Sequence, residues 1–476
     1  MFYGRKETLD DLARLWKKSG ASLVTVRGRR RIGKSTLVEE FAKESDARFI
    51  KLEGKAPERR MTNDEQLKSF CSQLKRMTKS KRLSASDWSE AFALLDDVLD
   101  NRRTVVLLDE ISWMGKYAVG FSGDLKIAWD NLWCKHPHTI VFICGSVSAW
   151  ITKNILDSTG FVGRRAMDIV LEELPLVDCI KFWRRKADKV SIRDVIDVLS
   201  VTGGVPKYLE EIDPALSADE NIRRMCFGKS GILSNDFDET FSDVFEGESS
   251  SRREILESLS SGPRNVSEIA EALGKERNGH LSEALDDLVL SGFVAKDDGF
   301  NPKTGAPTRE SRYRLKDNYA RFYLKYIRPR KALIAKDGFR FAALEQLDGW
   351  DTILGLQFEN LILNHVVDLL PHLGLDRTLL TSASPYRRSS RGKGEGVQID
   401  LLILSKRFRY IVEIKRRDTI GREVISEVER KVSLLPTMKG ISTRTALVYE
   451  GNLSKAVEGD GFFDAIVPVA TVLGRR

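Results

Sequence analysis

The segment Gly28–Ser35, with the sequence GRRRIGKS, carries the clearest chemical pattern in the chain. It fits G-x4-G-K-[S/T] and lies between an expected strand, Leu23–Arg27, and an expected helix, Lys34–Ala42, which is the context this pattern requires. Glycines let the backbone curl so that successive N–H groups face phosphate oxygens, and the start of the helix adds positive potential. The segment therefore predicts a phosphate-binding loop. The residues expected to bind nucleotide here are Gly28, Arg29, Arg30, Arg31, Ile32, Gly33, Lys34, Ser35 and Thr36.

A nucleotide site of this kind also needs a carboxylate, and the apolar strand Thr104–Glu110 (TVVLLDE) ends in two. We expect Lys34 to reach the β- and γ-phosphates and the Ser35 hydroxyl to ligate Mg²⁺ together with Asp109. Glu110 is then placed to polarise the attacking water, which favours hydrolysis over transfer of the phosphoryl group to a small molecule.

Two further groups are candidates for the same site. Ser146 closes the apolar strand Thr139–Ser146, where it either senses the γ-phosphate or is an ordinary hydroxyl at a strand end. Arg164 and Arg165 in FVGRRA either approach the phosphates, from the same or a neighbouring subunit, or form a surface pair.

A second set of chemical groups lies near the C-terminus. Asp400 falls in VQIDLLIL, and Glu413 and Lys415 fall in RYIVEIK, where the period of two puts both on one face of a strand. Glu359 lies on an expected helix, Ile353–Leu370. Asp400 and Glu413 would hold Mg²⁺ or Mn²⁺, with Glu359 as another ligand and Lys415 positioning water at a phosphodiester. The alternative is a salt-bridged hairpin without catalysis.

The elements that must position these groups indicate an α/β protein with several domains. Continuous apolar strands predict a parallel sheet covered by helices on both faces. Helical patterns follow, then an acidic, serine-rich linker, Phe245–Glu254, and then three short helices and a hairpin, as in a winged helix-turn-helix. We expect four domains: a P-loop ATPase domain at 1–168, a helical lid at 169–248, a winged helix at 249–330 and a nuclease-like α/β domain at 331–476.

The expected third helix of the winged helix, His280–Ser291, does not favour DNA reading. Its exposed face carries Ser282, Glu283, Asp286 and Asp287, and an acidic face is repelled by phosphates. This favours a packing or autoinhibitory module. The basic candidates that keep DNA binding open are Arg277, His280, Lys303, Arg309 and Arg312.

Composition sets the remaining limits. The chain has 476 residues, 53.8 kDa and a formal net charge of +8, and its basic residues gather in clusters suited to phosphate-rich partners. No run of about 18 apolar residues is present, and the N-terminus has no apolar signal core. The five cysteines lack CxxC spacing. These features predict a cytoplasmic protein with reduced thiols.

Several segments together resemble the archaeal-type prokaryotic ATPases of the AAA+/STAND kind, over roughly the first 330 residues. They are FYGRKETLDDL, the P-loop, LLDEISWM, CGS, GRR, GGVPKYL and RLKDNYARFYLKYIRP. The resemblance implies an ATP-binding domain with a helical lid, in which the Gly-Gly-x-Pro segment around Pro206 senses nucleotide.

The order of Glu359, Asp400 and Glu413-x-Lys415 resembles the PD-(D/E)xK nuclease superfamily, with Ile399 in place of the proline. The resemblance implies either an active nuclease or an inactive binding domain. Basic residues suited to a DNA-facing groove are Arg387, Arg388, Arg391, Lys393, Arg416 and Arg417. We therefore expect ATP hydrolysis to control metal-dependent DNA cleavage. The alternatives are a DNA- or partner-binding switch and assembly into homo-oligomers.

Overall fold

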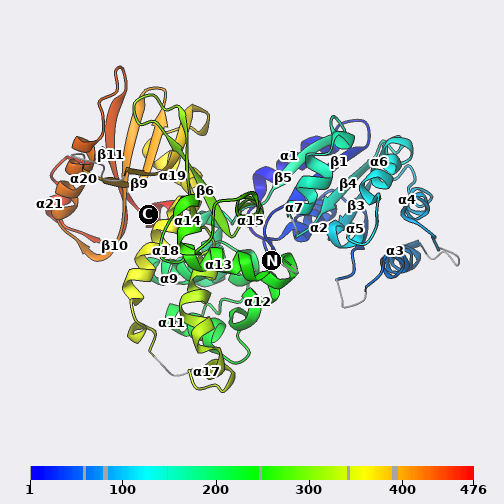
Figure 1. The fold of residues 1–476 in the computed structure, drawn as a ribbon, viewed down its shortest axis with the longest axis horizontal. Coiled ribbons are helices and arrows are strands. Elements are labelled where there is room, and N and C mark those ends of the chain that lie inside the picture. The colour runs from blue at the N-terminus through cyan, green and yellow to red at the C-terminus, as the bar shows by residue number, and fades with distance from the viewer. Residues whose placement is uncertain are drawn as a thin grey trace. The chain divides into compact units, whose positions relative to one another are not determined.

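The computed structural model describes residues 2–56, 61–78, 84–146, 148–245, 249–339, 343–388 and 395–475. Arg391 and Lys393 lie outside these ranges, and so does the side chain of Arg309. The chain forms two compact units, Met1–Glu172 and Glu173–Arg476 (Figure 1). The four domain boundaries expected from sequence stay a prediction.

The first unit is built on a parallel five-stranded sheet with the order β2-β3-β4-β1-β5. Each residue of β3 and β4 is buried, as the continuous apolar runs predicted, and this confirms the P-loop NTPase type of sheet. The strands are β1 Ser22–Arg27, β2 Arg48–Glu53, β3 Thr104–Asp109, β4 Thr139–Cys144 and β5 Arg165–Val170.

Helix α2 packs on β2, β3 and β4, and α3 packs on β2 and α4. Beneath the sheet lies an aromatic core in which the Trp88 ring meets Phe70, Phe92 and Phe121 at centroid distances of 5.5, 5.5 and 4.8 Å. The α-helices are α1 Lys6–Trp16, α2 Lys34–Glu44, α3 Asn63–Thr78, α4 Trp88–Asp96, α5 Ile111–Gly115, α6 Phe121–Asn131 and α7 Ser148–Ile151.

The second unit opens with helices, as the sequence predicted. They are α8 Leu176–Cys179, α9 Ile192–Thr202, α10 Pro206–Leu209, α11 Ala218–Ile222 and α12 Ile232–Val244. The segment expected to be a linker is partly helical, because α13 already begins at Ser249. That expectation was wrong for 249–254, where Arg252 turns inward and forms an ion pair with Asp287.

A winged helix follows and confirms the predicted order of elements. Helices α13 Ser249–Leu259, α14 Val266–Ala272 and α15 Gly279–Leu290 precede the antiparallel pair β6 Val294–Phe300 and β7 Pro307–Leu315. Asn265 and Asn278 cap α14 and α15 through their side chains, which fixes where both helices start. The sequence pattern predicts the wing strands at Phe293–Ala295 and Ser311–Leu315, and both strands are longer in the structure.

The C-terminal sheet has the order β12-β11-β10-β9-β8, with β9 antiparallel to β8 and β10, and β11 parallel to β10 and β12. Its strands are β8 Leu380–Arg388, β9 Val397–Ser405, β10 Phe408–Ile420, β11 Ser442–Leu453 and β12 Ala465–Pro468. The helices after the wing are α16 Asn318–Phe322, α17 Lys331–Ala335, α18 Trp350–Asn364, α19 Val366–Leu369, α20 Glu423–Leu434, α21 Lys455–Glu458 and α22 Val469–Val472. The single helix expected over Ile353–Leu370 is broken at His365.

Within the described residues, no single helix is both long and apolar enough to cross a membrane, and one bent pair, Trp350–Asn364 with Val366–Leu373, meets the same test of length and composition. All five cysteines are free thiols.

Candidate nucleotide site and C-terminal carboxylate cluster

The loop Gly28–Ser35 adopts a conformation that needs glycine. Gly28 has φ 143° and Gly33 has φ 90°, and a side chain on Gly28 would place its Cβ 2.4 Å from the Leu171 carbonyl oxygen. Lys34 is buried, and its Nζ donates to the carbonyl oxygens of Gly28 and Arg29 at 2.9 Å each. The ammonium group is therefore held inside the loop, where the sequence expects phosphate.

Ser35 and Asp109 meet where α2 begins and β3 ends. The Ser35 hydroxyl donates to Asp109 Oδ2 at 2.6 Å, and Asp109 is buried. A hydroxyl beside a carboxylate is a hard-oxygen donor pair of the kind that Mg²⁺ prefers. Lys51 on β2 was missed from sequence: its Nζ lies 3.4 Å from Asp109 Oδ2 and 3.1 Å from Glu39 Oε1. Lys51 lies in an edge strand whose apolar and polar residues alternate, and this pattern did not predict its contact with Asp109.

Glu110 and Ser146 are hydrogen-bonded to each other. Glu110 has φ 48° at the start of α5, and its Oε2 accepts from the Ser146 amide at 2.9 Å and from the Ser146 hydroxyl at 2.8 Å. The structure thus joins two residues that the sequence assigned separate tasks. To reach an attacking water, Glu110 must give up these two bonds.

Arg164 is engaged elsewhere in the first unit. Its Nε and Nη2 donate to Asp130 Oδ1 and Oδ2 at 2.6 and 2.9 Å. The hydrogen bond from Arg164 lowers the pKa of Asp130 to about 2. Among the residues described, the structure brings Arg164 to Asp130 and not to the phosphate loop.

The segment around Pro206 is tightly built into the second unit. The Gly204 amide donates to Glu173 Oε2 at 2.9 Å, and a Cβ on Gly203 would lie 2.6 Å from Glu173 Oε1. A Cβ on Gly204 would likewise lie 2.8 Å from the Leu174 carbonyl oxygen, so both glycines are required for this packing, and Pro206 starts α10 after the intervening Val205. The expected role of Pro206 toward the nucleotide stays a prediction.

In the C-terminal sheet, the structure brings Asp400, Glu413 and Lys415 together. β9 pairs with β10 with Leu401 opposite Val412, and the Ile414 amide donates to Asp400 Oδ2 at 2.9 Å. Glu413 is 0% exposed, and Lys415 Nζ lies 2.8 Å from its Oε1. Glu413 and Lys415 are the two groups that the sequence placed on one strand face, and Asp400 joins them from the neighbouring strand.

Glu359 on α18 belongs to the same electrostatic cluster. Burial raises the pKa of Asp400 to about 6, and the charge of Glu413 adds to this. Burial also raises the pKa of Glu359 to about 7, followed by the charge of Asp400. Acidic groups with such pKa values occur where carboxylates are packed together out of water.

Two residues of α20 complete the cluster and were missed from sequence. Lys431 Nζ lies 2.5 Å from Glu413 Oε2 and 3.9 Å from Asp400 Oδ1, and Glu427 contacts Lys415 at 2.8 Å. Glu427 and Lys431 are four residues apart, so they share a helix face. In the sequence, this four-residue spacing was the only feature that linked the two residues. The same spacing is common on solvent-exposed helices, so it did not predict the cluster.

The basic residues assigned to a DNA-facing groove do not all face solvent. The side chain of Arg416 is only 4% exposed, and its Nη2 contacts Asp197 Oδ1 on α9 at 2.5 Å. The assignment of Arg416 to a groove was therefore wrong, because its side chain is buried and pairs with the half-buried Asp197. Arg387 and Arg417 are exposed, and Arg388 is half-buried.

The described side chains include no group of three or more His, Cys, Asp or Glu residues arranged to hold a metal ion. In the C-terminal cluster, the Lys431 ammonium contacts Glu413 and lies near Asp400, where a cation shared by the two carboxylates would sit. The cluster has the oxygen donors for a divalent cation, but binding one requires Lys431 to move.

Comparison with known families decides the nature of the first site. Residues 2–212 match the family described as an ATPase domain predominantly from Archaea. This stretch of the chain therefore resembles an archaeal-type ATPase domain. Residues 249–296 match the bacterial regulatory protein arsR family, in agreement with the winged helix that the structure shows.

Individual relatives of this ATPase are distant. An uncharacterised protein of Methanocaldococcus jannaschii is 22% identical over 431 residues, 89% of each chain, and an uncharacterised ATP-binding protein of the same organism is 46% identical over 41 residues, 9% of this chain and 70% of that one. A Walker-type ATPase of Pyrococcus abyssi has a TM-score of 0.48 and 18% identity, covering 68% of this chain and 96% of its own. Because that TM-score is below 0.5, the assignment rests on the family match.

Proposed function

We propose that the protein binds ATP with Mg²⁺ at Gly28–Ser35 and hydrolyses it, and that the nucleotide state controls the C-terminal part of the second unit. The observation that carries this is the Ser35–Asp109 pair beside the buried Lys34, within a domain of an ATPase family. Lys34 would leave its two carbonyl partners for phosphate oxygens. Glu110 would leave Ser146 to accept a proton from the attacking water.

Ser35 and Asp109 would hold the Mg²⁺ ion. When bound, the ion would neutralise the charge that develops on the transferred phosphoryl group. The amide groups of the loop orient the phosphates, because the glycines at 28 and 33 let the backbone turn its N–H groups inward.

For the output, we infer metal-dependent cleavage of a DNA phosphodiester. Four groups of the expected kinds, Glu359, Asp400, Glu413 and Lys415, come from α18, β9 and β10 into one cluster. Asp400 and Glu413 would hold Mg²⁺ or Mn²⁺, which supplies Lewis acidity at the phosphate. Lys415 would position a nearby water molecule by donating a hydrogen bond to it from its ammonium group.

The second candidate is a DNA- or partner-binding switch that does not cut. It is favoured by the two lysines, Lys415 and Lys431, that already neutralise Glu413. A cluster that is electrically satisfied without a metal is what a binding domain retains.

The experiment is incubation of the purified protein with plasmid and linear DNA, with Mg²⁺ or Mn²⁺, with and without ATP. The variants are Lys34→Ala and Asp400→Ala, and Asp376→Ala serves as a matched control because Asp376 is exposed and lies outside the cluster. ATP hydrolysis is measured in parallel.

Cutting that is lost in Asp400→Ala and kept in Asp376→Ala establishes the nuclease, and its loss in Lys34→Ala shows that ATP licenses it. Absence of cutting with every metal, with ATP hydrolysis intact, selects the binding switch. Absence of ATP hydrolysis in the unmodified protein contradicts the proposal for the first unit.

A further inference from the structure

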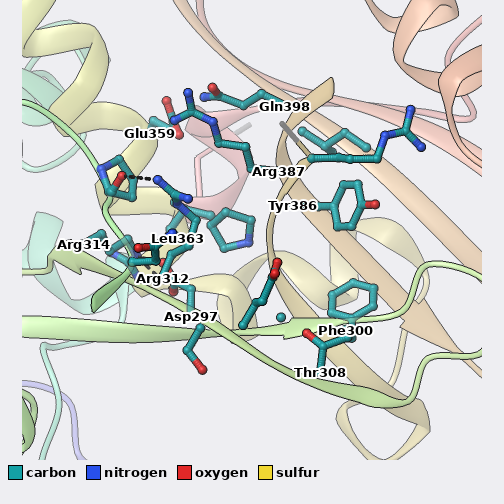
Figure 2. Close-up of a pocket in the computed structure, with 18 of the residues that line it drawn as sticks. Asp297, Phe300, Thr308, Arg312, Arg314, Glu359, Leu363, Tyr386, Arg387 and Gln398 are labelled. Carbon is teal, nitrogen blue, oxygen red and sulfur yellow. Dashed lines mark hydrogen bonds and ion pairs between the residues drawn. The ribbon is translucent and has the colours of Figure 1, made fainter. Parts of the chain in front are cut away.

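A cavity of about 600 Å³ lies within the second unit, between the wing strands β6 and β7, helix α18 and the strands β8 and β9 (Figure 2). Ligand pockets commonly measure about 300–1,000 Å³, so this volume suits a small organic ligand or one nucleotide unit. β8 is the outer strand of its sheet, and its Ser384 hydroxyl donates to the Asp298 carbonyl oxygen of β6 at 3.1 Å. The cavity is thus walled by both the winged helix and the C-terminal sheet.

The cavity has an excess of guanidinium groups over carboxylates that can neutralise them. Arg312 pairs with Glu268, and Arg314 pairs with Asp297. The other three arginines that line the cavity form no ion pair with a carboxylate among the described residues; they are Arg321, Arg387 and Arg388. The acidic groups left on the wall are Glu310 and Glu359.

Arg321 is the most deeply placed of these arginines. It is 2% exposed, its Nη1 and Nη2 donate to Gln357 Oε1 and the Leu315 carbonyl oxygen, and its Nε is buried without a hydrogen-bond partner in the described part of the chain. Its hydrogen bonds go to neutral acceptors, and the charges of Glu359 and Asp317 offset only part of the cost of burying this cation, since burial still lowers the pKa of Arg321 to about 10. An anion in the cavity would lower that cost, which points to an anionic ligand.

The opposite wall supplies an aromatic surface. Figure 2 shows Tyr386 beside Phe300 on one side of the cavity, and Arg312, Arg314 and Arg387 on the other. Phe300 is buried in the core, whereas Tyr386 is half-buried and leaves ring surface to the cavity. The exposed Gln398 adds an amide that can both donate and accept. Arginines facing an aromatic ring and an amide match the phosphate, the π-face and the edge of a nucleotide.

We propose that this cavity is a second nucleotide site, which binds a nucleoside phosphate with its phosphate at Arg387 and its base on the opposite wall, against Tyr386 and beside Arg388. The ligand is either a free nucleotide or the phosphorylated end of a nucleic-acid strand, since both present the same groups. Binding would tie the wing to the C-terminal sheet. The site is separate from the phosphate loop. It adjoins the carboxylate cluster through Glu359, and it requires no cleavage by Asp400 or Glu413.

The test uses the full chain carrying Lys34→Ala, which removes nucleotide binding at the first site, in EDTA so that no metal-dependent step contributes. Equilibrium binding is measured for fluorescent AMP and ATP, and for a short single-stranded DNA with and without a 5′-phosphate. The added variants are Arg387→Ala with Arg388→Ala, and Tyr386→Leu. Arg430→Ala is the matched control, because Arg430 is exposed on α20 and does not line the cavity.

We expect binding to weaken by about tenfold or more in the double arginine variant, the loss typical of a charged hydrogen bond, and to stay unchanged in Arg430→Ala. Tyr386→Leu should weaken binding as well. Binding of AMP or ATP identifies a free nucleotide as the ligand. Preference for the 5′-phosphorylated strand over the unphosphorylated one identifies the phosphorylated end of a nucleic-acid strand.

No binding of any probe overturns the proposal. So does binding that is equal with and without the phosphate, or equal in the double arginine variant and its control. Because the assay contains no metal and no functional phosphate loop, these outcomes leave the proposals for ATP hydrolysis and DNA cleavage untouched.

Discussion

Glu110 sits in a left-handed conformation at the start of α5, with its carboxylate turned to Ser146. A general base contributes typically about 10²–10⁴-fold to a rate. A glutamine at this position keeps an oxygen that accepts the same two hydrogen bonds, so the local structure is preserved while the base is removed. The role of the Glu110 carboxylate in catalysis can therefore be tested separately from its role in folding.

We predict that Glu110→Gln lowers kcat for ATP hydrolysis by about 10²-fold or more and leaves ATP binding within about twofold. Steady-state hydrolysis and binding of a fluorescent ATP analogue check this. Glu44→Gln is the control, since Glu44 is exposed in the same unit. Equal hydrolysis rates in both variants would show that another group acts as the base.

Glu359 is the second residue whose charge can be removed with little change in the shape of its side chain. Its folded pKa is raised to about 7 from an ordinary value of 4.5, chiefly by burial. A carboxyl group with a raised pKa binds more protons in the folded state than in the unfolded state between these values. Its contribution to stability is therefore present below about pH 4.5 and is lost as the pH rises through about 7.

We predict that Glu359→Gln stabilises the protein at pH 8 by on the order of 2 kcal/mol and has little effect at pH 4.5, because glutamine mimics the protonated acid. Calorimetric unfolding of the full chain at both pH values measures the difference. Glu345→Gln, at an exposed position, should show no such pH dependence. A gain of equal size at both pH values would mean that the charge of Glu359 is not buried.

At the scale of elements, α9 is joined to the C-terminal sheet by a buried ionic contact. Arg416 on β10 contacts Asp197 on α9 at 2.5 Å, and its Nε lies 3.6 Å from Glu450 on β11. Burial raises the pKa of both acids. The attraction of Arg416 therefore offsets only part of the free energy that desolvation of the two carboxylates costs. Removing it would leave two carboxylates in a poorly solvated position.

We predict that Arg416→Ala destabilises the second unit by about 3–5 kcal/mol, the usual cost of breaking a buried pair from one side. Its sequence neighbour provides the control: Arg417 is exposed and lies 3.5 Å from Glu423, so Arg417→Ala should cost less than about 1 kcal/mol. Denaturant unfolding measures both. Similar losses for the two variants would contradict the burial argument.

The elements also show how far the sequence could be interpreted. Buried strands such as β3 and β4 were predicted because continuous apolar runs mark them, and the three helices of the wing domain were predicted from their periodicity. β2, β5, β8 and β12 were missed, and all four lie at sheet edges, where one side of the strand needs no apolar residue. The cavity was missed as well, because no strand was predicted over 380–388, where β8 forms one of its walls.

For the site, the sequence predicted the groups that lie within one short segment or on one strand face, Gly28–Ser35 and Glu413 with Lys415. Of the contacts between distant segments, those of Ser35 with Asp109 and of Asp400 with the Glu413 strand were expected from their motifs, and the others gave no signal. Lys51 and Lys431 reach their carboxylates across neighbouring elements, and Glu110 meets Ser146 only because β3 and β4 are adjacent. Such contacts depend on the packing of whole elements.

At the scale of the molecule, the boundary between the units falls inside the ATPase domain. The family match runs to residue 212, whereas the first compact unit ends at Glu172. The phosphate loop lies before this boundary, and the segment Gly203–Pro206 lies after it. If that segment senses nucleotide, hydrolysis requires both units while binding of the phosphates requires mainly the first.

We predict that a fragment of residues 1–172 binds ATP and hydrolyses it about 10²-fold more slowly than the full chain, since a misplaced or missing positioning group costs about that much. Pro206→Ala in the full chain tests the same idea without relying on a fragment that must fold alone, and it should lower hydrolysis while preserving binding. Lys207→Ala is its control, because among the described residues Lys207 forms its ion pair with Glu210, the residue that follows α10. Full hydrolysis by the fragment, together with unchanged rates in Pro206→Ala, would place all of the catalytic machinery in the first unit. The second unit would then respond to the nucleotide state without contributing to hydrolysis.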